Sequence, residues 1–385
     1  MFLLKLLLRN AFRHKLRTSL TILSITIALL AFGLLRTFIG AWYAGAEATS
    51  ANRLVARNAV SLIFSLPLSY KEKIRQVDGV KQVSYGNWFG GIYIDEKNFF
   101  ANYAVEPKSY LDLYPEYILP PDQRDAFLRD RKAFVAGRKL AARFGWRLGN
   151  IVTLRGTIFP GNWEFVMRSI YSGRDPNTDE TVFFFHWDYL NETLKKTAPL
   201  RADQVGFYMI GVTRPDRAAG VALTIDKLFK NSIAETLTET EKAFVMGFIT
   251  MSEAIIVAIE LVSFVVIIII IAVAANTMSM TARERIGEYA IFKTLGYKGW
   301  RMAGMIIGES LVITMIGGFL GIAITFPAAK VTGKLLANYF PIFRVPEEII
   351  LMDLTASMIV GLAAAIVPTW RALKIRIADG LRRIG

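Results

Sequence analysis

The sequence contains no cysteine and only two histidines, His14 and His186, which lie far apart along the chain. Without cysteine the fold uses neither a disulfide nor a thiolate metal site. Neither histidine has a partner at the spacing of a metal-ligand set or of a catalytic triad. The simplest interpretation places His14 in a basic helix and His186 in an aromatic strand. We therefore expect no catalytic residue and no metal site in this chain.

A nucleotide-binding loop is also missing from the sequence. The phosphate-binding pattern G-x-x-x-x-G-K-[ST] does not occur, and the nearest approach, VTGKLL at 331–336, lacks the leading glycine. The chain is therefore not expected to bind ATP through such a loop, and no cofactor is expected on it.

Hydrophobic residues, by contrast, make up 53% of the chain. A hydrocarbon core of ~30 Å requires about 20 helical residues, and four apolar stretches reach that length. They lie at about 18–40, 250–277, 302–328 and 349–370. The long segment between the first two is mixed in polarity. The pattern predicts a polytopic α-helical membrane protein with four transmembrane helices and a large extracytoplasmic α+β domain between the first and second.

Basic residues near the ends of the apolar stretches predict the orientation. The segments 1–20, 281–301 and 370–385 are rich in Lys and Arg, and they hold twelve of the fourteen net positive charges. Such residues favour the cytoplasmic side of a membrane. Both termini are therefore predicted to be cytoplasmic and the large domain to lie outside. Because the excess positive charge is accounted for by the orientation of the spans in the membrane, a nucleic-acid partner is not expected.

The start of the chain allows two interpretations. A secretory signal peptide would also have a basic region and an apolar core, with Ala44-Gly45-Ala46 as its cleavage site. Against it, basic residues recur every four positions beside apolar ones, at Lys5, Arg9, Arg13 and Arg17. This spacing gives one helix a cationic and an apolar stripe, which predicts an amphipathic helix in the cytoplasmic interface over 1–17.

The large domain shows a mixture of helix and strand patterns. Helices are predicted at about 69–77 and 137–144, and strands at 151–154 and within ETVFFFHWDYL, residues 180–190. Residues 218–245 have a helical pattern that is expected to continue into the second span.

A short, charged segment, NTMSMTARERIGEYAIFKTLGYKGWRM, joins the second and third spans at 276–302. Thr281 and Glu284 fit a capping box, and Gly296 fits a helix stop, which together predict a helix at 281–296. Its exposed charges are expected at Arg283, Glu284, Arg285 and Glu288. A solvated loop whose charges only fix topology is the alternative, but it explains neither the interleaved glutamates nor the cap.

Two further patterns lie within the spans. Gly304 with Gly308, and Gly317 with Gly321, are small-residue pairs that allow close helix packing.

The second pattern is a pair of opposite charges. Counting ~1.5 Å per residue places Arg36 and Glu260 at a similar depth, roughly 27–29 Å from the inner face. We expect them to form an ion pair, within one chain or across a dimer. Alternatively, Arg36 reaches the outer headgroups and Glu260 is protonated or hydrated.

These patterns divide the chain into nine parts. They are the interfacial helix 1–17, the first span with its stalk 18–47, the outer domain 48–240, the stalk and second span 241–280, the coupling helix 281–300, the third span 301–328, an outer loop 329–348, the fourth span 349–370 and a cytoplasmic tail 371–385.

The segment from Asn276 to Gly296 reads N-T-M-x-M-x-x-R-E-R-x-x-E-x-x-I-x-x-x-L-G, which resembles the signature of the MacB/FtsX-like permeases, membrane subunits of one class of ABC transporter. LLLRNAFRHKLRTSLTILSITIA, VAGRKLAARFGWRLGNIVTL, and GESLVITMIGGFLG followed by VPTWRALKIRIADGLR resemble other parts of these proteins. The size and layout are most similar to LolC/LolE-like or stand-alone MacB-like members.

The resemblance implies a non-catalytic permease subunit in the bacterial cytoplasmic (inner) membrane. A separate ABC ATPase subunit would carry the ATP and magnesium. It would bind through the coupling residues Thr281, Arg283, Glu284, Arg285, Glu288, Leu295 and Gly296. The other implied partners are a second copy in a homodimer or a related permease, and a periplasmic adaptor.

The implied mechanism is mechanotransmission, in which ATP hydrolysis moves the outer domains to extract or expel an amphipathic or lipid-like substrate. One alternative is an FtsX-like signalling permease that regulates a cell-envelope enzyme without transport. Another is a membrane-anchored ligand sensor, which would have no ATPase partner.

Overall fold

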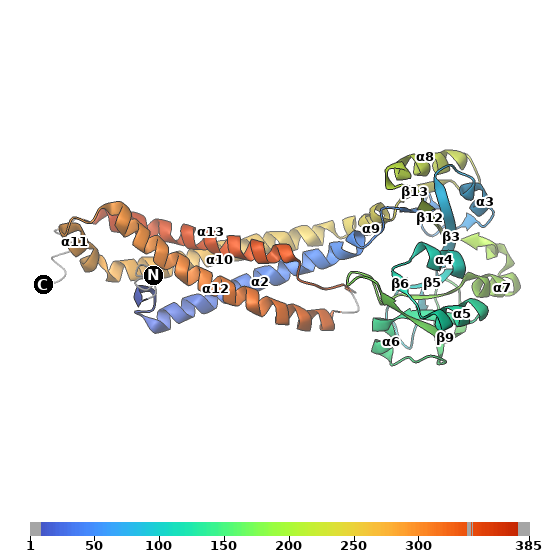
Figure 1. Cartoon of the computed structure of the whole chain (residues 1–385), viewed down its shortest axis with the longest axis horizontal. Coiled ribbons are helices and arrows are strands. Elements are labelled where there is room, and N and C mark those ends of the chain that lie inside the picture. The colour runs from blue at the N-terminus through green and yellow to red at the C-terminus, as the bar shows by residue number, and fades with distance from the viewer. Residues whose placement is uncertain (1–8, 337–339, 341, 376–385) are drawn as a thin grey trace. The chain divides into compact units, whose positions relative to one another are not determined.

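The computed structural model describes residues 9–336, 340 and 342–375, and the chain divides into two compact units (Figure 1). Unit 1 contains Met1–Trp42, Ser252–Leu335 and Phe343–Gly385, and unit 2 contains Tyr43–Met251 and Leu336–Ile342. Part of the predicted interfacial helix (1–8), part of the outer loop (337–339 and 341) and most of the tail (376–385) lie outside the described residues.

Unit 1 is a bundle of long helices: α2 (Lys15–Glu47, which continues into unit 2), α10 (Glu253–Glu284), α12 (Gly299–Leu335) and α13 (Glu347–Lys374). Within the described residues, these are the four helices that are long and apolar enough to cross a membrane. The four predicted spans are therefore confirmed, and each helix extends beyond the predicted span at both ends or at one end.

The bundle is apolar inside and outside, as expected for helices in lipid. Ile25 and Leu29 of α2 are fully buried and pack with Ile270 of α10, Ile313 of α12 and Val360 of α13. Leucines and isoleucines on other helix faces are exposed, and in α2 they include Leu20, Leu23 and Ile27.

One glycine pair of α12 packs closely against α2. A Cβ added at Gly317 would lie 2.7 Å from Cγ2 of Ile25, and one added at Gly321 would lie 3.1 Å from Cβ of Leu29. A Cβ at Gly304 would meet nothing within 4 Å, and Gly308 is half-buried. The predicted close packing is therefore seen at the second pair, whereas Gly304 faces open space.

Unit 2 is the predicted α+β domain. Its eleven-stranded mixed sheet has the order β13-β1-β12-β3-β5-β10-β7-β9-β8-β4, with β6 paired to β9. The strands are β1 (Arg53–Asn58), β3 (Val80–Trp88), β4 (Gly91–Ile92), β5 (Asn102–Val105), β6 (Tyr117–Ile118), β7 (Ala133–Gly137), β8 (Ile151–Gly156), β9 (Gly161–Gly173), β10 (Phe183–His186), β12 (Phe207–Val212) and β13 (Thr236–Thr240). A separate pair joins β2 (Leu66–Pro67) to β11 (Gln204–Val205).

Seven helices accompany the sheet of unit 2. They are α3 (Tyr70–Arg75), α4 (Pro107–Leu113), α5 (Pro121–Arg129), α6 (Arg138–Phe144), α7 (Trp187–Thr197), α8 (Ala218–Leu228) and α9 (Glu241–Thr250). Two 3-10 turns also occur: η1 (Pro199–Arg201) lies between α7 and β11, and η2 (Pro215–Arg217) lies between β12 and α8.

Aromatic residues form the two cores of unit 2. Along β10, Phe183 and Phe185 belong to one hydrophobic cluster and Phe184 belongs to the other, as the alternation of side chains in a strand requires. His186 is buried at the end of this strand, and its Nε2 lies 2.7 Å from the carbonyl oxygen of Phe127. Its placement in an aromatic strand agrees with the sequence interpretation.

The prediction of one helix over 218–245 is wrong. The helix α8 ends at Leu228, Asn231 adopts a left-handed φ of +60°, and the threonine-rich segment Thr236–Thr240 forms β13. Thr240 then caps α9, because its hydroxyl accepts a hydrogen bond from the amide of Ala243 at 3.1 Å. The helical pattern was misleading because strand pairing with β1 uses the β-branched residues between the two helices.

The two glycines of α12 provide a matched test of helix packing. Gly317→Val should lower the thermal stability of the purified chain, by about 1–3 kcal/mol, because the added side chain overlaps Ile25. Gly304→Val introduces the same side chain into the same helix at an open position and should have little effect. Equal losses of stability in the two variants would contradict this packing.

Candidate functional site

The connection between α10 and α12 is a short helix, α11 (Ile286–Thr294). The chain stays helical to Glu284, and Arg285, with φ −101° and ψ 15°, breaks the helix. Thr281 lies inside α10, where its hydroxyl donates a hydrogen bond to the carbonyl of Thr277 at 3.1 Å. The predicted cap at Thr281 is therefore wrong, because the apolar helix continues past it and the hydroxyl bonds back into that helix.

The helix α11 ends next to Gly296, where the sequence predicts a helix stop, and Gly296 has a φ of +78°. The amide of Gly296 donates to the carbonyl of Lys293 at 3.1 Å, and that of Tyr297 donates to Phe292 at 3.0 Å. The rings of Phe292 and Tyr297 lie 5.3 Å apart. These bonds and the apolar contact form a Schellman motif, which terminates the helix and turns the chain toward α12.

Arg285 is buried at the break between α10 and α11, with an exposed fraction of 6%. Its Nε donates to Glu288 at 3.0 Å, and its Nη1 donates to Glu309 of α12 at 2.8 Å. Glu309 is equally buried. The expectation that Arg285 is an exposed docking charge is therefore wrong, and its guanidinium instead joins the connection to α12.

The glutamates of this connection are bound by the basic residues that precede and begin α2. Arg17 donates to both carboxylate oxygens of Glu284, at 2.7 and 2.8 Å, and His14 Nε2 lies 3.6 Å from the same carboxylate. Arg13 donates to Glu288. Arg13 and Arg17 of the N-terminal basic stripe therefore contact protein carboxylates. We call these basic residues and His14, together with Glu284, Glu288, Arg285 and Glu309, the charge cluster.

The cluster also sets the protonation of Glu288. Burial raises the pKa of Glu288, but hydrogen bonds from Arg13 and Arg285 outweigh that effect and hold the pKa below its ordinary value. Glu288 is therefore an anion that links two cations from different segments. The sequence pattern did not predict these links, although it did place these basic and acidic residues on the same side of the membrane.

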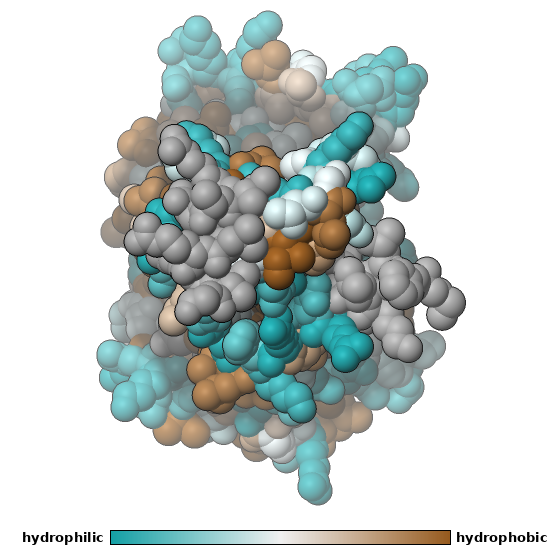
Figure 2. All heavy atoms as spheres, turned by 90° about the vertical axis from the view of Figure 1, so that its left-hand side faces the viewer, coloured by the Kyte–Doolittle hydropathy of each residue, from teal (hydrophilic) through white to brown (hydrophobic). Residues whose placement is uncertain are grey.

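An apolar surface remains exposed beside the cluster. We call it the α11 patch, and it consists of Ile291, Leu295, Tyr297 and Trp300, whose exposed fractions range from 41% to 69%. Arg301 borders it, with its guanidinium 5.4 Å from the Trp300 ring. Figure 2 views this end of the chain and shows hydrophobic residues surrounded by hydrophilic ones. Arg283 is also exposed.

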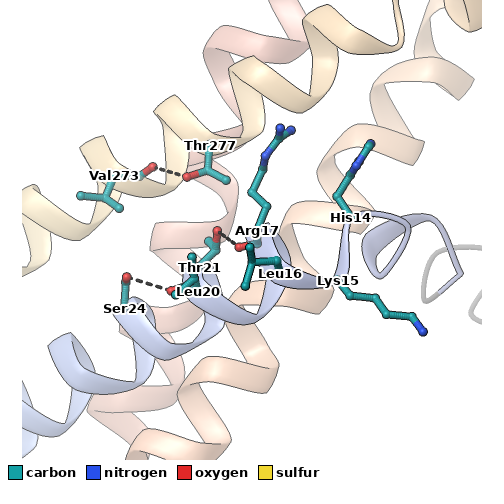
Figure 3. Close-up of a pocket in the computed structure, with 9 residues that line it drawn as sticks. All are labelled: His14, Lys15, Leu16, Arg17, Leu20, Thr21, Ser24, Val273 and Thr277. Carbon is teal, nitrogen blue, oxygen red and sulfur yellow. Dashed lines mark hydrogen bonds between the residues drawn. The ribbon is translucent and has the colours of Figure 1, made fainter.

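A groove of 620 Å³ lies between the start of α2 and the last turns of α10 (Figure 3). The hydroxyls of Thr21 and Ser24 donate to carbonyls of α2, and that of Thr277 donates to α10. Two of its three basic residues, His14 and Arg17, face Glu284. The groove therefore presents little net charge to a ligand.

Unit 2 contains a second buried ionic network, centred on Arg53, the first residue of β1. Its Nε donates to Glu241 at 2.6 Å, Nη2 lies 2.7 Å from Glu116, and Nη1 donates to the carbonyl of Leu113 at 3.1 Å. Tyr114 donates its hydroxyl to Glu241 at 2.9 Å. We call this network the Arg53 clamp.

The Arg53 clamp joins two segments that connect unit 2 to the helix bundle along the chain. Arg53 follows α2 by a few residues, and Glu241 begins α9, which is followed by α10. Both side chains are buried. Within unit 2, the clamp therefore joins the start of β1 to the start of α9, two elements that lie next to α2 and α10 in the chain.

Arg36 and Glu260 lie together in unit 1. Nη1 of Arg36 donates to Oε1 of Glu260 at 3.1 Å within one chain. The guanidinium also lies over the rings of Phe32 and Phe264, at 5.5 and 5.6 Å from their centroids. Among residues 9–336, 340 and 342–375, no group of three or more His, Asp or Glu side chains could hold a metal ion.

Comparisons with known proteins connect this arrangement to a family. Residues 260–377, which include most of α10 and all of α11, α12 and α13, match the profile of the FtsX-like permease C-terminal domain. The uncharacterized ABC transporter permease YvrN of Bacillus subtilis is 35% identical over 108 residues, or 28% of this chain, and the chain spans only 25% of that relative. The uncharacterized ABC transporter permease MJ1507 of Methanocaldococcus jannaschii is 24% identical over 332 residues, which cover 80% of this chain and 77% of the relative.

Two solved structures resemble about half of the chain. The extracellular domain of the noncanonic ABC-type transporter YknZ from Gram-positive bacteria has 14% identity and a TM-score of 0.36, over 49% of this chain and 99% of that domain. A domain of a putative permease protein from Porphyromonas gingivalis has 13% identity and a TM-score of 0.34, over 49% and 90%. Similarity at this level says nothing about function.

The lowered pKa of Glu288 predicts a pH dependence. Its ionised form stabilises the folded chain above its ordinary pKa of 4.5, and this stabilisation is lost as the pH falls through the lower folded-state pKa. Glu288→Gln should therefore reduce the change in melting temperature between about pH 6 and about pH 3. Glu348→Gln, at an exposed site in the first turn of α13, is the control. An unchanged pH dependence in Glu288→Gln would contradict the linkage.

Proposed function

We propose that this chain is a member of the FtsX/MacB-like permease family and the transmembrane subunit of an ABC transporter driven by a separate ATPase subunit. The proposal places the termini and α11 in the cytoplasm and unit 2 outside the bacterial inner membrane. ATP and magnesium belong to the ATPase, and this chain is a non-catalytic subunit. We further propose that the permease acts as a dimer, with a second copy or a related permease.

The α11 patch is the proposed docking surface for the ATPase, and it is the observation that carries the proposal. Leu295, at the end of α11, and Trp300, in the first turn of α12, are both more than two-thirds exposed, and the Gly296 motif fixes the turn between the two helices. An apolar centre surrounded by charges is typical of protein interfaces, in which buried aromatic and aliphatic side chains supply most of the affinity. Arg301 borders the patch and Arg283 is also exposed, and both would steer an acidic surface of the ATPase.

The expected role of Glu284 and Glu288 changes accordingly. Both carboxylates are occupied by Arg13, Arg17 and Arg285 within the chain. We propose that they hold α11 in position for docking rather than contact the ATPase directly. Reversing their charges would disrupt the charge cluster itself, so such variants do not isolate the docking step.

Mechanotransmission is the proposed mechanism. Movement of α11 would pass to α12 through the Arg285 to Glu309 ion pair and to α2 through Arg13 and Arg17. The helices α2 and α10 lead to unit 2 along the chain, and the Arg53 clamp joins β1, the first strand after α2, to α9, the helix before α10. A displacement of these helices would therefore move the outer domain as one body.

The proposed substrate is amphipathic or lipid-like and is handled on the outer side, with a periplasmic adaptor as a further partner. Within the spans, most hydroxyls bond back to their own helices, as at Thr21, Ser24, Thr37, Ser263 and Thr325, and so do not offer a polar pore lining. Unit 2, by contrast, has a polar cleft of 550 Å³ lined by Arg53, Lys81, Arg174, Asp112, Glu116 and Asp175, among other residues.

A signalling permease that drives a cell-envelope enzyme without transport is the second candidate. The Arg53 clamp favours this candidate equally, because it would transmit movement within unit 2 whether or not a substrate is carried. Both candidates require the ATPase, whereas a membrane-anchored ligand sensor would have none. Co-purification of a stoichiometric ATPase therefore separates the first two functions from the third.

Docking through the α11 patch predicts a specific loss of the ATPase. Leu295→Asp combined with Trp300→Asp should abolish its co-purification, because two carboxylates would be buried in the interface without partners. The matched control is Ile63→Asp with Leu200→Asp, which changes two exposed apolar residues of unit 2. Retention of a stoichiometric ATPase by the Leu295 and Trp300 variant would contradict the docking surface.

Transmission through the Arg53 clamp predicts that Glu241→Gln separates hydrolysis from outer-domain movement. The variant loses the charge that holds Arg53 to α9, and it should cost about 1.5–3 kcal/mol of unit 2 stability. In the cysteine-free chain, a spin label at an introduced Lys97→Cys would report movement of unit 2 on ATP addition. We expect that signal to fall while ATPase activity remains.

The neighbouring pair of Arg57 and Glu239 supplies the control. It joins β1 to β13, the strand directly before α9, at 3.2 Å but is more exposed, so Glu239→Gln should leave the spin-label response unchanged. An equal response in the Glu241→Gln variant and the unmodified chain would exclude the clamp from transmission.

A further inference from the structure

Asp353, one and a half turns into α13, has a carboxylate that the fold leaves without a partner. The residue is fully buried, and neither Oδ1 nor Oδ2 has a hydrogen-bond partner among the described residues. A buried carboxylate normally has a cation or several donors, since the cost of leaving it unsatisfied is large. The charge cluster, the Arg53 clamp and the Arg36 pair do not involve it.

The surroundings of Asp353 explain why it lacks a donor. A Cβ added at Gly33 of α2 would lie 3.0 Å from Oδ2 of Asp353 and 3.1 Å from Oγ1 of Thr325. The Thr325 hydroxyl donates to the carbonyl of Gly321, and the Ser357 hydroxyl donates to main-chain carbonyls of α13. The hydroxyl protons near this carboxylate are therefore directed elsewhere.

Arg36 is the nearest cation along the helix that touches Asp353. It lies one turn beyond Gly33 on α2, which corresponds to a rise of about 4.5 Å and an angular offset of about 60°. Among the described residues its ionic partner is Glu260, whose side chain is 47% exposed, and its own Nε is buried without a hydrogen-bond partner. A partly buried cation is thus incompletely satisfied one helical turn from the glycine that faces a buried, unpartnered acid.

We infer that Asp353 is a second, intramembrane binding position for the guanidinium of Arg36. A local rotation of α2 around Gly33 and Arg36 by about 60° about the helix axis, with Arg17 still bound to Glu284, would direct Arg36 toward α13 instead of α10. Arg36 would leave Glu260, which is already half-exposed, and would satisfy Asp353. Each arrangement contains one ion pair, so the two can differ by little free energy, as a two-state element requires.

The absence of a side chain at Gly33 makes this rotation sterically feasible. Gly33 lies on the surface through which α2 contacts α12 and α13. The inference adds a defined switch to the bundle and goes beyond the proposed function. The switch itself requires only this chain, and the proposed function enters only when ATPase activity is measured.

The chain alone provides the first test. Leu29→Cys and Gly321→Cys form a reporter pair, because the Cβ positions are 3.1 Å apart in the present packing and the chain has no other cysteine. The Cβ atoms of a disulfide lie about 3.5–4.5 Å apart, so the present 3.1 Å permits the bond after a small relaxation. A rotation of about 60° would swing position 29 away from position 321 and out of this range, which should reduce the yield. The pair is oxidised in native membranes in three backgrounds: unmodified, Glu260→Gln and Asp353→Asn.

Glu260→Gln removes the first partner of Arg36 and should lower the disulfide yield to about half or less, by releasing α2 toward Asp353. Asp353→Asn removes the second partner and should retain or raise the yield. Combining Asp353→Asn with Glu260→Gln should restore the high yield, because neither carboxylate then attracts Arg36. If Glu260→Gln lowers the yield equally with and without Asp353, the inference is wrong.

The second test measures ATPase activity with the partner subunit. Glu260→Gln and Asp353→Asn should shift the activity in opposite directions, since they favour opposite positions of Arg36. Two losses of equal size would indicate a purely structural role and would overturn the switch. If no ATPase binds the unmodified chain, the proposed function fails, but the disulfide yields still decide this inference independently.

Discussion

Every charge that this chain removes from water needs an opposite charge nearby, and that requirement shapes both units. Arg285 shows it most clearly, because its guanidinium is buried at a helix break and contacts carboxylates on both sides. Removing either partner of such a pair would leave a buried charge uncompensated, which is far more costly than losing an exposed ion pair. The position of α11 is therefore set by ionic contacts with α12 and with the start of α2, more than by its own short hydrogen-bonded turns.

The need to pair buried charges also explains which features could be predicted from the sequence and which could not. The four spans follow from length and hydropathy alone, since no soluble fold accounts for such runs of apolar residues. The stop at Gly296 also follows, because a glycine after an apolar turn has a local physical meaning. Counting residues along the first two spans was enough to predict that Arg36 and Glu260 lie at a similar depth in the membrane. These inferences need only local geometry or a simple count along an axis.

The ionic partners of Arg285, Arg53 and Glu288 required the tertiary structure. Arg13 and Glu288 are 275 residues apart in sequence, and Arg53 and Glu241 are 188 apart, so no local pattern connects them. Thr281 failed as a predicted cap for a related reason: its spacing to Glu284 is correct, but the tertiary bundle extends α10 through that turn. Charge patterns indicated which residues share a side of the membrane, and packing then decided which of them meet.

A permease that transmits movement needs rigid connections separated by a few places that can change. The Arg53 clamp and the charge cluster are rigid in this sense, because each buried cation has two or more acceptors. The middle of the bundle differs, since Asp353 has no donor and Arg36 has an unsatisfied Nε. Full satisfaction of the charge cluster would carry a displacement without absorbing it, and the incomplete satisfaction of Asp353 and Arg36 leaves an alternative arrangement accessible. The unpartnered carboxylate and the unsatisfied guanidinium nitrogen therefore mark a deformable place within the helix bundle.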